Sequence, residues 1–374
     1  MKYLKKVIEF DPANNTAHDL LGVILAMMGK SDEVIKHFEK LLVLDPNNST
    51  AHVGLGNAFA SMNHHAKASE HFDVALGLDP DNIIAHIGKA FAMVHLDNAI
   101  EAIKSFESVL KLDPDNAAAH VGCGEMLLLL YMPVKAIKCF DKATMLDRDD
   151  PEPHVGKGKA FLLLERPVKA IKCYDIALKL DPDNVNAHIG KGTALMALER
   201  PVKAIKCFDA VIRLDPKYEI SYRSKGDALH MLKKYDIAIE YFNTAIRLDP
   251  KNDLAYVSKG ETLHSLKKYD DAIECFDAAI RLDPKYEISY RAKGETLYTL
   301  KKYDDAIECF DTALRADPEY IMAYAKKVLT LLALDKYDDA LKCYDMMVTL
   351  DPNNPVLSHV KIEIDRYNKQ DTKA

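Results

Sequence analysis

The 374-residue chain combines 48% apolar with 29% charged residues and carries a formal net charge of -7 at a pI near 6.1. This composition is that of a folded protein rather than a disordered one, and the acidic balance gives no reason to expect a nucleic acid as partner. The opening MKYLKKVIEF lacks the apolar core of a secretory signal, and no apolar run is long enough to cross a bilayer, so we expect a soluble cytoplasmic protein.

Residues 1–14 predict one helix and a closing turn, FDPANN, which match only the second half of the unit repeated further along. No preceding helix covers the apolar side chains of this helix, which include Tyr3, Leu4, Val7 and Ile8. Exposed apolar surface of this kind favours association. The N-terminal helix could therefore dock on a second copy to form a homo-oligomer, or the chain could be a piece of a longer protein.

From Asn15 the chain repeats every 34 residues, ten times, without insertion or deletion. An Asp-Pro pair closes every repeat except the fourth, in which Arg148 replaces the proline. With places numbered from Asn15, place eight is mostly Gly, place twenty is mostly Ala, and place twenty-four is always Phe or Tyr. A fixed period with small residues at fixed places is typical of a stack of similar helical units.

Each repeat predicts two helices. In the seventh repeat, apolar and aromatic side chains recur at helical spacing over residues 220–232 and again over 234–248. The second helix ends because the Asp-Pro pair removes a backbone donor and disfavours helix in the preceding residue. Three second helices begin with a proline, which suits a first turn: Pro133, Pro167 and Pro201.

Ten complete repeats thus occupy residues 15–354, and residues 355–374 predict one more first helix. This last helix becomes polar toward DRYNKQDTKA. A polar outer face is what a helix that caps a repeat stack requires.

A 34-residue helix pair with Gly at place eight, Ala at place twenty, Phe or Tyr at place twenty-four and a closing Asp-Pro resembles the tetratricopeptide repeat (TPR) family. The resemblance implies an all-α fold, an α-α solenoid of antiparallel helix pairs wound into a right-handed superhelix, with first helices on the concave face. It also implies a non-catalytic protein that binds peptides or whole proteins there. Place seven departs from the family, because it is often Lys instead of Leu; we expect its stem to cover apolar surface while the ammonium stays in water.

The resemblance implies partner contacts through places two, five, nine, twelve and thirteen of the first helices. In repeats two to six the candidates at places five and nine are Val53, Asn57, Ile87, Val121, Glu125, Val155, Lys159, Ile189 and Thr193. In repeats seven to nine the candidates at places five, nine and twelve are mainly polar: Arg223, Asp227, His230, Val257, Glu261, His264, Arg291, Glu295 and Tyr298. The Lys and Asn pattern with which some family members clamp a C-terminal carboxylate is not matched.

Place six is Gly in five successive repeats: Gly54, Gly88, Gly122, Gly156 and Gly190. Mid-helix glycine costs about 1 kcal/mol relative to alanine, so such a row suggests a role. We expect a shallow apolar groove where the missing side chains let a partner helix approach. Replacing Val121 and Val155 with Glu should then prevent binding without unfolding the protein. The alternative is that this row packs against the next repeat.

Signals for chemistry are weak. Six of the seven cysteines recur at place twenty-three, too far apart for disulfides between repeats, and only Cys123 falls on a first helix. Histidines at place four are also too widely spaced to share an ion, and the stretch NHHAKASEH suggests at most adventitious surface metal binding. The GxG pairs fall within helices and not in a phosphate loop. We therefore expect no enzyme activity, no cofactor, no metal, and neither nucleic acid nor membrane as partner.

The sequence therefore favours a cytoplasmic scaffold that holds a helical or peptide segment of a partner protein on its concave face. Two alternatives remain open. One is a self-assembling structural protein, and the other is a regulatory module that acts on a separate enzyme.

Overall fold

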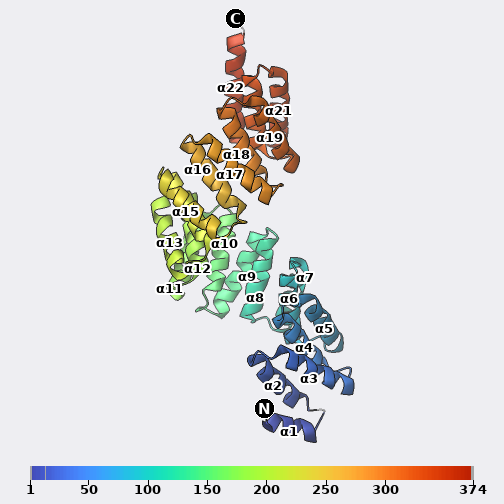
Figure 1. Ribbon diagram of the computed structural model, residues 1–374. Helices are drawn as coiled ribbons and strands as arrows, with labels where there is room; N and C mark the ends of the chain where they lie inside the picture. Colours follow the sequence, from blue (N-terminus) through green and yellow to red (C-terminus); the bar gives the residue numbers. More distant parts are fainter. Residues whose placement is uncertain (1, 13, 372–374) are drawn as a thin grey trace. The chain divides into compact units, whose positions relative to one another are not determined.

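The computed structural model describes residues 2–12 and 14–371, and the regular structure in these residues is entirely helical (Figure 1). Twenty-two helices follow one another, and they pack in sequential pairs such as α8 with α9. The all-α arrangement of paired helices that the 34-residue period predicts is confirmed. Met1, Ala13 and residues 372–374, which belong to the predicted terminal segments and to the first closing turn, lie outside the described residues.

The first helices of the ten pairs have nearly equal lengths, as the repeat requires. They are α2 (Asn15–Met27), α4 (Ser49–Ser61), α6 (Ile83–His95), α8 (Ala117–Leu129), α10 (Glu152–Leu163), α12 (Val185–Ala197), α14 (Glu219–Met231), α16 (Asp253–Ser265), α18 (Glu287–Thr299) and α20 (Ile321–Ala333).

The second helices each end directly before the aspartate of the closing turn. They are α3 (Ser31–Leu44), α5 (His65–Leu78), α7 (Ala99–Leu112), α9 (Pro133–Leu146), α11 (Pro167–Leu180), α13 (Pro201–Leu214), α15 (Tyr235–Leu248), α17 (Tyr269–Leu282), α19 (Tyr303–Ala316) and α21 (Tyr337–Leu350). Helices α1 (Lys2–Phe10) and α22 (Pro355–Asp371) flank the pairs. None of the helices in the described part of the chain is both long and apolar enough to cross a membrane.

The chain divides into two compact units, Met1–Ala194 and Leu195–Ala374. In the first unit, Leu4 and Ile8 of α1 pack against the core formed by α2, α3 and α4. The expectation that these two side chains lack cover is therefore wrong. In the second unit, α22 packs against α20 and α21 and contributes buried apolar residues to their core.

The turn inside each repeat holds one residue in the left-handed region at place fifteen. In the first repeat this residue is Gly29, with φ 67°. In the others it carries a side chain: Asn63, Asp97, Tyr131, Glu165, Glu199, Lys233, Lys267, Lys301 and Asp335. Because this region disfavours residues with a Cβ, the surrounding helix pair must hold the turn in place.

The aromatic ring at place twenty-four is the largest buried group of a typical repeat. Phe72 is fully buried, and its ring lies against Gly56 of its own repeat and Gly88 of the next. A Cβ at either glycine would overlap the ring. The two glycines therefore let a second helix pack closely against the first helices on both sides of it.

Lysine at place seven forms an ion pair with aspartate at place twenty-five of the preceding repeat. Six such pairs have Nζ–Oδ1 distances of 2.5–2.8 Å: Lys89–Asp73, Lys157–Asp141, Lys191–Asp175, Lys225–Asp209, Lys293–Asp277 and Lys327–Asp311. The ammonium groups are not simply in water, as the sequence suggested. They join neighbouring repeats through what we call the Lys–Asp ladder.

Candidate functional site

The predicted contact residues all lie on first helices, from α4 to α18, but many of them are not free surface. Val53, Val155 and Val257 are buried in the cores of their repeats, and Val155 is only 1% exposed. Half-buried Ile87 and Val121 pack against the core of repeats three and four. Ile189 is half-buried as well.

In the first unit, the predicted contact residues at place nine are more exposed than those at place five. Asn57, Glu125, Lys159 and Thr193 are exposed on α4, α8, α10 and α12. Their side chains can reach a partner without any change in the core.

The glycine row at place six does not form an open groove. Each of these glycines faces the aromatic ring of the preceding repeat, as Gly122 faces Phe106 and Gly156 faces Phe140. The missing side chains make room for these rings and not for a partner helix, so the predicted groove is wrong. Val155→Glu would bury an unpaired carboxylate, so this variant should disturb folding and not only binding.

The first unit does contain a hollow elsewhere, which we call the N-terminal pocket. It has a volume of about 600 Å³ and lies over α2, α3, α4 and the start of α6. Its lining is Gly22, Val23, Gly29, Ser31, Val34, Phe38, Thr50, Val53, Gly54, Asn57, Ala58, Ser61, Asn82 and Ile84. The lining combines apolar side chains with a few hydroxyl and amide groups, which is the usual character of a ligand-binding pocket.

Only Val53 and Asn57 of the predicted contact residues line this pocket. Val23 and Ile84, at places nine and two, are 51% and 62% exposed and were not singled out in the sequence. Their places belong to the usual contact set of the family, and that pattern was the signal available for finding them.

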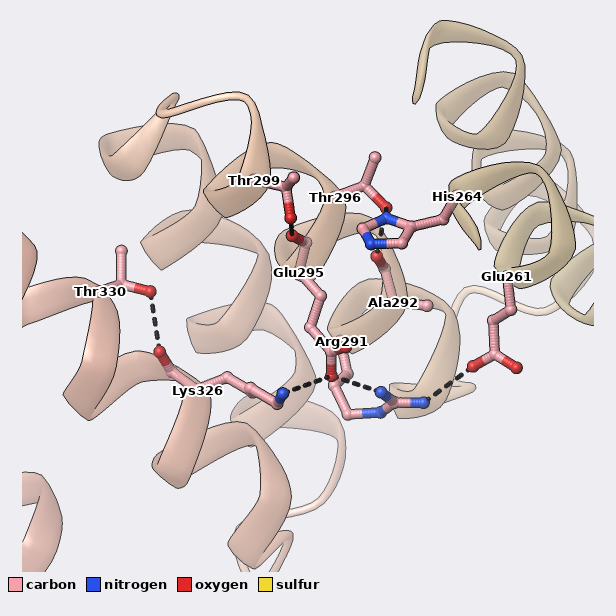
Figure 2. Close-up of polar contacts among 9 residues, drawn as sticks. All are labelled: Glu261, His264, Arg291, Ala292, Glu295, Thr296, Thr299, Lys326 and Thr330. Atoms are coloured by element: carbon pink, nitrogen blue, oxygen red, sulfur yellow. Dashed lines mark hydrogen bonds and ion pairs between the residues drawn. The ribbon is translucent and has the colours of Figure 1, made fainter. Parts of the chain in front are cut away.

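In the second unit, four charged side chains form what we call the Arg291 cluster: Glu261, Arg291, Glu295 and Lys326 (Figure 2). Arg291 lies between two carboxylates, at 2.5 Å from Glu295 on its own helix and 3.1 Å from Glu261 on α16. Lys326 of α20 approaches Glu295 at 3.7 Å. The cluster links three successive first helices through alternating charges.

The Arg291 guanidinium stays charged in this setting. Burial acts to lower its pKa, but Glu295, Tyr320 and Glu261 raise it by more, so that the pKa lies above its ordinary value. Glu261 is about half-exposed, with 45% of its side-chain surface accessible. One edge of the cluster is therefore open to a partner.

Arg223 is paired differently. It forms one bond to Asp227 in the next turn of α14, at 3.1 Å, while its buried Nε has no hydrogen-bond partner among the described residues. Burial raises the pKa of Asp227, and Arg223 and Ser258 offset only part of this effect. Because this Nε is buried, it is not accessible to a bound group.

The histidines at place twelve bond to threonines at place ten of the following repeat. His230 lies 2.8 Å from Thr262 Oγ1 through Nδ1, and His264 lies 2.9 Å from Thr296 Oγ1 in the same way. Each threonine hydroxyl donates to a carbonyl of its own helix, so its oxygen accepts the Nδ1–H of the histidine. These histidines position neighbouring helices, and burial lowers the pKa of His264.

The two threonines were missed in the sequence. Thr262 and Thr296 appear at place ten one repeat after a histidine appears at place twelve. The signal was that the histidine and the threonine occur together in neighbouring repeats. A comparison of one place at a time across the repeats does not detect it.

A second hollow, of about 610 Å³, lies on the side of the second helices α17 and α19. Its lining is strongly charged and contains the ion pair between Lys293 and Asp277. Because a ladder pair occupies it, this hollow is a weaker candidate for binding an apolar segment than the N-terminal pocket.

The histidine-rich first repeats form pairs and not larger clusters. His18 donates from Nε2 to the Pro12 carbonyl and accepts from His37 Nε2–H at 3.0 Å. His52 lies 3.1 Å from His71. No group of three or more metal-ligating side chains occurs within residues 2–12 and 14–371.

Models of the tetratricopeptide repeat match most of the chain. The matched residues are 20–83, 93–158, 155–219, 224–287 and 291–355.

Two solved structures have a similar fold. One is the crystal structure of the APC/C hetero-tetramer Cut9-Hcn1, with 14% identity, a TM-score of 0.57, and coverage of 97% of this chain and 92% of that one. The other is a tetratricopeptide repeat protein from Parabacteroides merdae, with 16% identity, a TM-score of 0.57, and coverage of 67% and 98%. No curated protein matches in sequence.

Proposed function

Because the chain belongs to the tetratricopeptide repeat family, we propose that it is a non-catalytic scaffold that holds a peptide or helical segment of a partner protein. The segment lies against the surface of the first helices. Its apolar side chains are anchored on the first helices of the first unit.

The N-terminal pocket is the main support for this proposal. Its volume of about 600 Å³ falls in the range of pockets that bind small molecules or a few side chains. Val23 and Ile84 offer exposed apolar contact at the pocket, while Asn57 can bond to the polar backbone of a segment. An apolar side chain of a partner can therefore be buried while its backbone remains hydrogen-bonded.

The Arg291 cluster is a second candidate surface, in the second unit, where a polar segment can bind by itself. Glu261 is half-exposed beside Arg291, and its carboxylate can accept a hydrogen bond from a polar segment. Mixed charge of this kind contributes specificity and association rate more than affinity. We expect binding to depend on salt mainly through this second surface.

Selection of peptides tests the proposal. A random peptide library displayed on phage is selected against the full chain, and the enriched peptides are synthesised and titrated by fluorescence anisotropy. We expect enriched peptides to share apolar anchors. Val23→Glu and Ile84→Glu, which place a charge on the exposed rim of the pocket, should weaken binding by about tenfold or more.

Val74→Glu is the matched control, because Val74 is 46% exposed on α5 but does not line the pocket. This variant should bind like the wild type. Peptides that bind all three variants equally well, or a selection that enriches none, would refute the proposal.

Self-association through α1 is a second candidate. Tyr3, Val7 and Phe10 are exposed on this helix, although Leu4 and Ile8 are packed inward. Size-exclusion chromatography with light scattering distinguishes the candidates: a mass that rises with concentration and falls in Phe10→Glu supports self-association, and a constant monomer mass excludes it.

A further inference from the structure

The Lys–Asp ladder is interrupted at repeat four by a cysteine. Place seven of this repeat is Cys123 on α8, and the residue at place twenty-five of the preceding repeat is Glu107. A thiol thus stands where other repeats have an ammonium group. Glu107 lacks the lysine that its counterparts in the ladder have.

The substitution brings two thiols together. Cys139, at place twenty-three on α9, packs against the same core cluster that contains Cys123, and the two side chains are hydrogen-bonded. In other repeats the cysteine at place twenty-three has a lysine beside it, as Cys173 has Lys157. All seven cysteines, which lie within the described residues, are free thiols in the structure.

We propose that Cys123 and Cys139 are a redox-active dithiol, which hydrogen peroxide oxidises to a disulfide that joins α8 to α9. The two residues lie on packed helices of one repeat, and the hydrogen bond between their thiols holds the two sulfur atoms next to each other, as disulfide formation requires. The distance between repeats excludes disulfides between cysteines at place twenty-three, but it does not apply to Cys123 and Cys139, which lie in the same repeat.

The two thiols have different roles in the reaction. Cys139 is partly accessible, whereas Cys123 is only 5% exposed. The hydrogen bond from Cys123 lowers the pKa of Cys139, while the same contact and burial raise the pKa of Cys123. Cys139 is therefore the thiol that meets the oxidant, and Cys123 is the one that resolves the product.

The chemistry balances in two steps. The Cys139 thiolate attacks one peroxide oxygen, so that an S–O bond forms, the O–O bond breaks, and the leaving hydroxide takes a proton to become water. Cys123 then loses its proton and attacks Sγ of the resulting sulfenic acid. An S–S bond forms, the S–O bond breaks, and the hydroxide leaves as water with that proton. Two thiols are oxidised by two electrons, and one peroxide is reduced to two waters.

Peptide mapping tests the proposal on the full chain. The reduced protein is treated with hydrogen peroxide, remaining thiols are alkylated, and tryptic peptides are identified by mass spectrometry without reduction. Cleavage after Lys135 and Lys138 places the two cysteines on different peptides. We expect a linked pair of these peptides, lighter by two hydrogens and separated again by dithiothreitol. The unfolding temperature should rise on oxidation, because the bond constrains the unfolded chain.

Cys173 is the internal control, since it occupies the same place in its repeat with Lys157 instead of a second thiol. Hydrogen peroxide should oxidise Cys173 at least about tenfold more slowly than Cys139. In Cys123→Ser the reaction should stop at a sulfenic acid on Cys139, which dimedone labels, and oxidation should no longer raise the unfolding temperature. Absence of the linked peptides in wild type, or equal oxidation of Cys139 and Cys173, would overturn the proposal.

Discussion

At Gly122 a single methyl group would occupy the space that the Phe106 ring fills. The ring is almost completely buried and cannot move out without opening a cavity. We therefore predict that Gly122→Ala lowers the free energy of unfolding by about 1–3 kcal/mol, despite the better helix propensity of alanine. Urea unfolding followed by circular dichroism measures this change.

Gly77 in α5 provides the matched control. Apart from its chain neighbours and the backbone of its own helix, no atom lies within 4 Å of the position that its Cβ would take. Gly77→Ala should therefore raise the free energy of unfolding by about 0.5–1 kcal/mol. If both alanines stabilise the protein, the glycine row is not required by the rings.

The pairing of His37 with His18 makes stability depend on pH. Burial lowers the pKa of His37, and the charges of His18, Lys40 and Lys5 act in the same direction. The folded protein therefore favours the neutral ring. This contribution to stability is present above the ordinary histidine pKa of about 6.5 and is lost as pH falls through the lowered folded-state value.

We predict that the free energy of unfolding decreases from about pH 7 to about pH 5, and decreases less in His37→Gln. The glutamine amide can still donate to His18 Nδ1, so the packing is retained. Urea titrations at several pH values provide the measurement. Parallel pH profiles for the two proteins would show that His37 is not responsible.

Between helices, the Lys–Asp ladder joins six pairs of neighbouring repeats. Lys225 lies 2.5 Å from Asp209 and 2.7 Å from the Tyr241 hydroxyl, and its ammonium lies over the Tyr241 ring. Lys225→Met keeps the length of the side chain but removes its charge. We predict a loss of about 1 kcal/mol in the free energy of unfolding, measured by urea unfolding at low salt.

Lys259 is the control within the same unit. Its counterpart at place twenty-five is Asn243, and Lys259 forms no ion pair within the part of the chain that the structure describes. Lys259→Met should therefore change the free energy of unfolding by no more than about 0.5 kcal/mol. Equal losses in both variants would mean that the methionine itself is poorly accommodated.

Across the whole molecule, the 34-residue period was enough to predict the helix pairs and their ends. Asp-Pro pairs and first-turn prolines such as Pro133 act locally, so the sequence contains the physical cause of each helix end. Repeats that contact only their neighbours also leave few alternative topologies.

The candidate surface was less predictable, because it depends on which side of a first helix the next repeat covers. Val155 and Lys159 both lie at usual contact places, yet Val155 is buried and Lys159 is exposed. The glycines at place six suggested open space, but a ring from the preceding repeat fills it. Such contacts involve two repeats at once, and helical periodicity within one repeat does not contain them.

The ladder also determines how evenly the stack is held together. Its pairs are absent at three interfaces. Leu55 replaces the lysine between repeats one and two, Cys123 replaces it between repeats three and four, and Asn243 replaces the aspartate between repeats seven and eight. In a stack where each repeat contacts only its neighbours, each interface contributes its own interaction free energy, and these free energies determine how cooperatively the stack unfolds. Thermal opening should therefore start at these three interfaces, and the runs of repeats between them should behave as separate cooperative blocks.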